Sequence, residues 1–317
     1  MQNQKRENLL NLALSATDEE RERSENLDVG YDPEERTWEL IVRHSGSLAG
    51  LAGAGIQVDE LLNGYAVLVV PEHLVDQVSE LNQIEYIEKP KRLFFASNMA
   101  RAASCLSVVQ SPSGTGNVTG GVISGLSGGL TGRGVLVAVI DSGIDYLNQD
   151  FRNEDGSTRI LMLMDQDRGR IYTREEINEA LDAPDRAGAL ERVPSVDLSG
   201  HGTAVAAIAA GNGRGSQGVY RGVAYESDLL VVKLGAPLAD NFPRTTQLMK
   251  GLDFVIRQAQ ELGRPVAVNL SFGNTYGSHD GTSLLETFMN DISNYGRSVL
   301  VAGTGNEGTG NGHTAGR

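Results

Sequence analysis

Two side chains in this sequence stand where proton transfer could take place. Asp141 directly follows the run Val-Leu-Val-Ala-Val-Ile, at the carboxyl end of an expected strand. His201 lies between glycines in Ser-Gly-His-Gly-Thr, immediately before an apolar helical run. Such a carboxylate can fix the tautomer of an imidazole, and the helix N-terminus disfavours a charged histidine, which suits a general base. Each residue alone has a plain structural explanation, because Asp-Ser-Gly favours turns and a lone histidine can be a cap.

A third candidate is Asn306, which follows another apolar run in Val-Ala-Gly-Thr-Gly-Asn. An amide flanked by glycines can donate a hydrogen bond to an oxyanion that develops on a substrate carbonyl. Taken alone, this segment reads better as a simple Gly-Asn turn.

The elements that would position these residues form an α/β pattern after residue 133. Apolar, β-branched runs alternate there with helical patterns, which indicates a parallel sheet covered on both faces. Functional residues gather beyond the carboxyl ends of the strands in such sheets. We expect strands at 135–140, 229–232, 266–270 and 299–302, and helices at 173–181, 203–210, 246–262 and 283–292.

A smaller domain is expected over residues 31–96. Its pattern is β-α-β-β-α-β, the split arrangement of ferredoxin-like α+β domains. The expected elements are strands at 37–43, 56–58, 65–70 and 84–88, and helices at 47–54 and 72–81. The charge-rich residues 1–30 predict a mobile tail or a marginal helix. The Gly- and Ser-rich residues 97–132 predict an exposed linker, which leaves 133–317 for the larger domain.

The segments around Asp141, His201 and Asn306 resemble the Asp, His and oxyanion-Asn motifs of the subtilisin-like (S8) serine proteases, in the same chain order. The resemblance implies a subtilisin-like parallel sheet flanked by helices, a serine endopeptidase activity and a protein or peptide substrate. The segment Ser271, Phe272 and Gly273 resembles the family's edge segment, which pairs with substrate backbone. The first domain is similar to the family's prosegment, which implies that it acts as an inhibitor.

Further segments are similar to the Csp branch of the family, the clostridial spore proteases that activate a cortex-lytic enzyme. They are Ile-Glu-Tyr-Ile-Glu-Lys-Pro-Lys-Arg, Ile-Tyr-Thr-Arg-Glu-Glu-Ile and Gly-Asn-Glu-Gly-Thr-Gly-Asn-Gly-His. This resemblance implies that the protein processes a precursor during spore germination. It also implies that the prosegment is cleaved between about residues 95 and 110.

The sequence departs from the family at the nucleophile. The family's serine lies in Gly-Thr-Ser-x-Ala, well after the oxyanion asparagine, and no serine follows Asn306. The catalytic serine is therefore expected outside this chain, and the chain alone is expected to be inactive. Ser283, in an earlier Gly-Thr-Ser, is better explained as a helix cap with Glu286. Two alternatives stay open: a pseudoprotease that binds a partner, which the intact Asp141 and His201 argue against, and a free-standing inhibitor made of residues 31–96.

Composition narrows the choice of partners and location. A net charge of −14 disfavours nucleic acid and anionic membranes as partners. The lone Cys105 excludes an intrachain disulfide and is explained as a small buried hydrophobic residue. No apolar run suits a signal peptide or a membrane span, which predicts cytoplasmic synthesis, with spore association implied by the Csp resemblance. We expect no cofactor or metal site; calcium could bind acidic loops, but no diagnostic ligand spacing is present.

Overall fold

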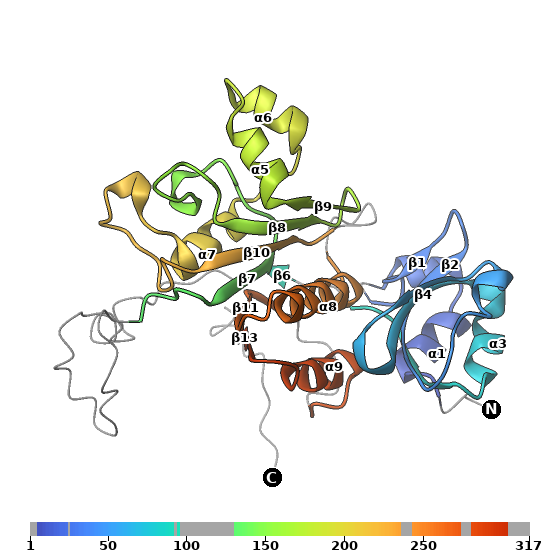
Figure 1. Cartoon of the computed structure of the whole chain (residues 1–317). Helices are drawn as coiled ribbons and strands as arrows, with labels where there is room; N and C mark the ends of the chain where they lie inside the picture. Colours follow the sequence, from blue (N-terminus) through green and yellow to red (C-terminus); the bar gives the residue numbers. More distant parts are fainter. Residues whose placement is uncertain are drawn as a thin grey trace, which may run out of the picture. The chain divides into compact units, whose positions relative to one another are not determined.

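The computed structural model describes residues 5–24, 26–91, 94–95, 130–235, 243–273 and 280–303. The chain divides into two compact units whose segments interleave along the sequence. The first unit contains residues 1–94, 235–256 and 274–295, and the second contains 95–234, 257–273 and 296–317. Each unit is built around its own sheet (Figure 1).

The sheet of the first unit is antiparallel. Its strands are β1 (Tyr31–Asp32), β2 (Thr37–His44), β3 (Gln57–Glu60), β4 (Tyr65–Pro71) and β5 (Ile84–Glu88). The spatial order β5-β2-β4-β3 is that of a ferredoxin-like domain, and β1 adds a short pairing to β2. Alternation along β2 buries Trp38, Leu40 and Val42 in one core. The expected small α+β domain is confirmed.

Two helices expected in this domain differ from the structure. Residues 47–54 contain only the 3-10 turn η1 (Ala52–Ala54), because Gly50 and Gly53 disfavour a regular helix. Residues 72–81 begin as the 3-10 turn η3 (Glu72–Leu74) and continue as α3 (Val75–Glu80).

The N-terminal residues, expected to form a mobile tail or a marginal helix, are helical. They form α1 (Asn8–Ser15) and α2 (Asp18–Glu22). Leu10 and Ala13 of α1 are fully buried in the core formed by the sheet of the first unit. Leu14 packs against the same core, so the inner face of α1 repeats at the spacing of a helix. The helix itself is uncharged, and the charge-rich residues lie on either side of it.

The first unit also holds two helix N-termini from the later part of the chain. They belong to α8 (Thr245–Glu261), which continues into the second unit, and to α9 (Leu284–Ser293). Glu39 of β2 accepts hydrogen bonds from the Thr246 hydroxyl at 2.9 Å and from the Arg244 guanidinium at 3.2 Å. Glu88 of β5 accepts the backbone N–H of Leu284 at 2.9 Å. Glu88 therefore satisfies a backbone donor at the start of α9, whereas Glu39 binds side chains at the start of α8.

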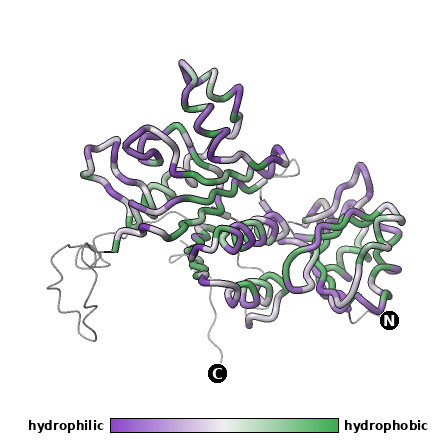
Figure 2. The backbone as a smooth tube through the Cα atoms, viewed as in Figure 1, coloured by the Kyte–Doolittle hydropathy of each residue, from purple (hydrophilic) through white to green (hydrophobic). Residues whose placement is uncertain are grey.

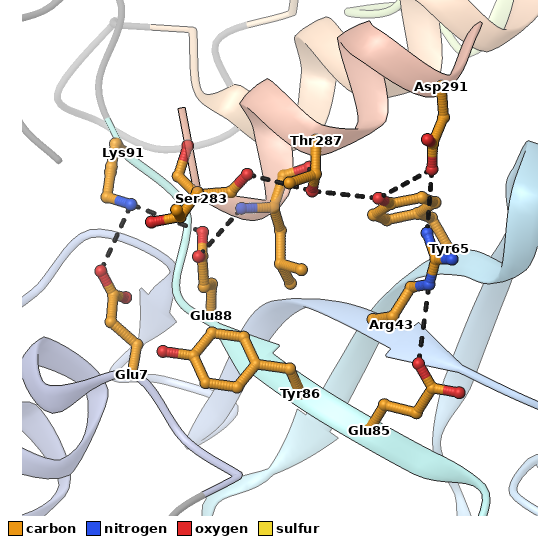
Figure 3. Close-up of a pocket in the computed structure, with 12 residues that line it drawn as sticks. Glu7, Arg43, Tyr65, Glu85, Tyr86, Glu88, Lys91, Ser283, Thr287 and Asp291 are labelled. Carbon is orange, nitrogen blue, oxygen red and sulfur yellow. Dashed lines mark hydrogen bonds and ion pairs between the residues drawn. The ribbon is translucent and has the colours of Figure 1, made fainter. Parts of the chain in front are cut away.

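A cavity of about 680 Å³ lies beside the first turns of α9 (Figure 3). Its charged walls are paired: Lys91 lies 3.5 Å from Glu88 and 3.3 Å from Glu7. Tyr65 donates to the Thr287 hydroxyl at 3.0 Å. Ser283 and Glu286 form the capping box expected for α9. Ser283 thus has the structural role that the sequence predicted.

The second sheet has six strands in the order β13-β11-β7-β10-β8-β9. They are β7 (Leu136–Asp141), β8 (Ile160–Asp165), β9 (Arg170–Thr173), β10 (Asp228–Lys233), β11 (Val266–Leu270) and β13 (Ser298–Ala302). All pairs are parallel except β8 with β9. The expected parallel sheet is confirmed, and β8 and β9 are additions that the sequence analysis missed. In Figure 2 the central strands are green, as befits strands buried on both faces.

Helices α5 (Arg174–Leu181), α6 (Arg186–Arg192) and α7 (His201–Ala210) belong to the second unit. Helix α7 packs on β7, and α5 packs on β8 and β9 (Figure 1). The side chains between α7 and the sheet form one core that includes Val139, Ala206 and Val231. The apolar run that follows His201 therefore supplies the inner face of a helix through Gly202, Ala206 and Ala210, while Ile208 is exposed. This inner face fixes the first residue of the helix against the strand ends.

A separate two-stranded sheet joins β6 (Phe94–Phe95) and β12 (Phe272–Gly273). Phe95 and β12 both belong to the second unit. The segment expected to pair with substrate backbone thus pairs with a strand of its own chain.

Candidate active site

Asp141 and His201 meet at the carboxyl end of the second sheet. Asp141 ends β7 and its side chain is fully buried, whereas His201 is the first residue of α7 and is 15% exposed. Asp141 Oδ1 lies 2.7 Å from His201 Nδ1. A carboxylate can only accept, so Nδ1 carries the proton and the neutral ring keeps Nε2 as its basic nitrogen. This is the tautomer that a general base requires.

Burial controls the electrostatics of Asp141. It raises the pKa of this carboxyl above its usual range, and the hydrogen bonds from His201 and from the Ser142 backbone act in the opposite direction. Asp141 Oδ2 is buried without a hydrogen-bond partner among the described residues. The single well-bonded oxygen, Oδ1, therefore faces the imidazole, and the desolvated carboxylate gains most when that imidazole becomes charged.

Two glycines beside His201 allow this close approach. Gly200 has φ of 73°, in the left-handed region that glycine adopts without strain. Gly202 lies so close to the end of β7 that a methyl group there would overlap the carbonyl oxygen of Gly143 and would lie 3.1 Å from Asp141 Oδ1. The sequence Gly-His-Gly is thus required by the turn into α7 and by the packing of α7 on β7.

A network of side chains ties the start of α7 to the residue after Asp141. Asp197 Oδ1 accepts hydrogen bonds from the Ser142 hydroxyl at 2.8 Å and from the Gly200 backbone at 2.9 Å. Asp197 Oδ2 accepts the Thr203 backbone N–H at 2.9 Å and its hydroxyl at 2.6 Å. Burial alone would raise the pKa of Asp197, but these hydrogen bonds outweigh it and hold the pKa below its usual range.

The structure brings together only part of the expected set. Asp141 and His201 are paired, whereas Asn306 lies outside the described residues. The Ser271 hydroxyl accepts a hydrogen bond from the Asn269 amide at 2.7 Å, Phe272 is buried and Gly273 is exposed. The role of these three residues in substrate binding stays a prediction.

Sequence reasoning missed Ser142, Asp197 and Thr203. The available signal was the pair of oxygen-bearing residues on either side of His201, since Asp and Thr commonly serve helix N-termini. Asp197 lies four residues before His201, outside the usual capping position, and only the turn at Gly200 brings it to the helix end.

Within the described ranges, no group of three or more His, Cys, Asp or Glu side chains could hold a metal ion. A search of the same residues finds no helix long and apolar enough to cross a membrane.

Comparison with known proteins finds two matching regions of the sequence. Residues 4–91 match the Csp protease B prodomain, and residues 132–316, more than half of the chain, match the subtilase family. The chain belongs to the subtilase family. Its prodomain match confirms the expected Csp branch, and the prodomain begins well before residue 31, in agreement with the buried helix α1.

Solved and curated relatives agree with this membership. This subtilase is 38% identical to the CspB protease of Clostridium perfringens, with a TM-score of 0.50, over 55% of this chain and 36% of that one. Fervidolysin of Fervidobacterium pennivorans, a keratinolytic enzyme related to subtilisin, shares the fold at 16% identity and a TM-score of 0.53, over 90% and 41% of the two chains. A subtilisin from Bacillus sp. strain TA39 is 27% identical over 262 residues, which are 81% of this chain and 52% of that protein. The chain thus spans about half the length of this curated relative. It covers 36% and 41% of the two solved chains.

Proposed function

We propose that the complete protein is a serine endopeptidase of the subtilisin class. The observation that carries the proposal is the 2.7 Å hydrogen bond between buried Asp141 and His201, held at the strand ends of a subtilase domain. In this role His201 Nε2 takes the proton of a serine as that serine attacks the peptide carbonyl. Asp141 stabilises the imidazolium that forms, and Asn306 donates to the oxyanion.

The nucleophilic serine is proposed to lie outside these 317 residues. Ser283, which has the tempting Gly-Thr-Ser context, is occupied by the capping box of α9. The edge strand β13 supports a longer domain, since Val299 and Val301 are 60% and 53% exposed on it. Parallel sheets bury their apolar strands, so this edge favours a further covering segment. The chain by itself would then lack the nucleophile and would not hydrolyse peptides.

The prodomain is proposed to act as an intramolecular inhibitor. Its Glu39 and Glu88 hold the first turns of α8 and α9, which belong to the segment matching the subtilase family. The pairing of β6 with β12 supports the same role, because an extended segment after the prodomain then lies on the edge segment of Ser271, Phe272 and Gly273. A protein or peptide substrate would add a strand at this edge in the same way.

The physiological substrate is proposed to be a protein precursor that is processed during spore germination. The support is the Csp resemblance of the prodomain and the similarity to a clostridial CspB protease. Cleavage of the prosegment is proposed between about residues 95 and 110, directly after β6.

The proposal is tested with the complete protein isolated from its native source. Intact mass and peptide mapping first establish whether a Gly-Thr-Ser-x-Ala segment is present, and hydrolysis of a denatured protein substrate is then measured. The His201→Ala variant is expected to lose about 10⁶-fold in kcat, the loss found in subtilisin itself. The pseudoprotease would instead be favoured if the complete protein is folded, keeps Asp141 and His201, and still hydrolyses no substrate.

A further inference from the structure

We propose that Asp197 is a positioning residue for the catalytic pair: it fastens the first turn of α7, and with it the His201 ring, to the strand end that carries Asp141. The inference deepens the proposed protease function and rests on it for its catalytic meaning. Its geometric content concerns only residues of the second unit that the structure describes.

The two carboxylate oxygens of Asp197 bind opposite sides of the gap between strand and helix. Oδ1 accepts the hydroxyl of Ser142, the residue that follows Asp141, at 2.8 Å. Oδ2 accepts both the backbone N–H and the hydroxyl of Thr203, in the first turn of α7, at 2.9 and 2.6 Å. One rigid, planar group therefore spans from the Asp141 strand to the His201 helix.

Ser142 closes the network on the other side. Its hydroxyl oxygen accepts the Gly202 backbone N–H at 2.9 Å and the Ser199 hydroxyl at 2.8 Å. The Ser142 backbone N–H donates to Asp141 Oδ1 at 2.7 Å, the same oxygen that accepts the hydrogen bond from His201 Nδ1. Displacement of Ser142 would therefore alter the catalytic carboxylate directly.

The far side of Thr203 is also fixed. Its hydroxyl oxygen accepts the Asp145 backbone N–H at 2.8 Å, which links the first turn of α7 to the loop after β7. The bonds of Asp197 satisfy two backbone donors near the start of α7, those of Gly200 and Thr203. Without the carboxylate these donors would need water, and α7 would lose the bridge from Thr203 to the Ser142 hydroxyl. Only the direct bond from the Gly202 backbone N–H would still join α7 to that hydroxyl.

The ring of His201 depends on this tie because its side chain makes a short bond to a buried partner. A hydrogen bond of 2.7 Å leaves little freedom for the helix to shift along the sheet. A displacement of roughly 1 Å at a catalytic group can cost about 10²-fold in rate. Asp197 touches neither His201 nor a reacting atom, so its effect is exerted through α7 and Ser142.

The direct test measures the proton on His201 Nδ1 in the full 317-residue chain. ¹H NMR of histidine-labelled protein should show a low-field ring N–H signal that disappears in Asp141→Asn. In Asp197→Ala, we expect this signal to be lost or its exchange with solvent to accelerate by about tenfold or more. In Asp197→Asn, which keeps Oδ1 as an acceptor, exchange should lie between the two.

A matched control separates positioning from stability. Asp185 caps α6 in the same unit by accepting the Gly188 backbone N–H at 2.8 Å. Asp185→Ala should lower the melting temperature but leave the His201 signal at its original exchange rate. If Asp197→Ala does not fold, Ser142→Ala provides the second variant, because it removes the hydroxyl that Asp197 holds and should also accelerate exchange. An unchanged signal in a folded Asp197→Ala or Ser142→Ala chain would overturn the inference.

The kinetic counterpart uses the complete protease. Asp197→Asn is expected to lower kcat about 10- to 100-fold with a KM changed by less than about twofold, since the effect falls on the reacting groups. An equal loss for Asp185→Ala would mean that general destabilisation is responsible and would overturn the inference. The NMR result needs no nucleophile, so a complete protein that proved inactive would refute the proposed function and leave the positioning result standing.

Discussion

Asp197 and Glu88 are carboxylates that satisfy helix N-termini, one in each unit, in different surroundings. Asp197 is only partly buried and accepts four short hydrogen bonds, from two backbone N–H groups and two hydroxyls, and a longer one from the Ser199 hydroxyl at 3.4 Å. The short bonds lower its pKa. Glu88 is 5% exposed and accepts the Leu284 backbone N–H, with Lys91 at 3.5 Å. Burial raises the pKa of Glu88 because Lys91 and the backbone bond do not offset the lost hydration.

The comparison indicates that the balance between burial and the number of donors sets the direction in which the pKa of a capping carboxylate shifts. Four good donors keep Asp197 ionised and rigid, which suits a group beside an active site. Glu88 accepts one backbone N–H and a longer hydrogen bond from Lys91, and is held less firmly. In the proposed inhibitor role, this would suit a contact that is later released.

The largest effect is expected from Glu88→Ala. The change leaves Lys91, whose side chain is 11% exposed, without one of its two carboxylates and leaves the Leu284 N–H unpaired. We expect a loss of about 3 kcal/mol in the free energy of unfolding, measured in urea through the fluorescence of the buried Trp38. Glu85→Ala, on the same strand, removes only a half-exposed partner of Arg43 at 3.7 Å. It should cost less than about 0.5 kcal/mol, and equal losses for the two variants would contradict the account.

Asp197→Ala should have the second largest effect. Loss of a carboxylate with four short hydrogen bonds is expected to lower the free energy of unfolding of the second unit by about 2 kcal/mol. Asp185→Ala, with a single capping bond to the α6 backbone, should cost about 1 kcal/mol. The measurement is native-state hydrogen exchange of α7 and α6 amides. A smaller loss for Asp197 than for Asp185 would break the comparison.

The two carboxylates should respond to pH in opposite directions. The pKa of Asp197 is lowered in the folded chain. Its contribution to the free energy of unfolding is therefore complete above the ordinary aspartate pKa of about 3.9 and is lost as the pH falls through the pKa of the folded state. The pKa of Glu88 is raised in the folded chain. Its contribution to the free energy of unfolding is therefore complete below the ordinary glutamate pKa of about 4.3 and is lost as the pH rises through the pKa of the folded state.

This contrast is measured as a difference between wild type and variant. Urea unfolding is measured from pH 3 to pH 8. The free energy of unfolding of wild type should exceed that of Glu88→Gln by an amount that decreases as the pH rises. The corresponding difference between wild type and Asp197→Asn should decrease as the pH falls. Parallel slopes for the two pairs would contradict the assignment of opposite charge preferences.

The smallest effect is expected from Ser283→Ala. Ser283 supplies the capping box at the same helix end that Glu88 supports, and its loss should cost about 1 kcal/mol. Labelling of the complete protease by a fluorophosphonate should be unchanged. Loss of labelling in a folded Ser283→Ala variant would make Ser283 a candidate nucleophile and would contradict its structural assignment.

The sequence predicted those features that depend on local patterns. The strand runs that end at Asp141 and at Leu270, the helix after His201 and the cap at Ser283 were all visible as apolar runs or capping residues. The pairing of Asp141 with His201 followed from the rule that strand ends in a parallel sheet share one edge, together with the family resemblance.

The features that escaped prediction depend on tertiary contacts. Helix α1 is short and lies between charge-rich segments, and the burial of Leu10 and Ala13, with Leu14 packed beside them, appears only in the folded core. Strand β8 has apolar side chains, but its place inside the six-stranded sheet is seen only from its pairing with β10. Asp197 reaches the end of α7 through a left-handed turn at Gly200. The periodicity of apolar residues in the sequence does not predict such a turn.

The central claim, that Asp141 and His201 serve a subtilisin-type serine, is tested most directly by fluorophosphonate labelling of the complete folded protein, followed by mapping of the labelled peptide. The account predicts one labelled serine in a Gly-Thr-Ser segment beyond Arg317, with labelling abolished by His201→Ala. A complete folded protein that takes up no label, or whose labelling persists in His201→Ala, would contradict it.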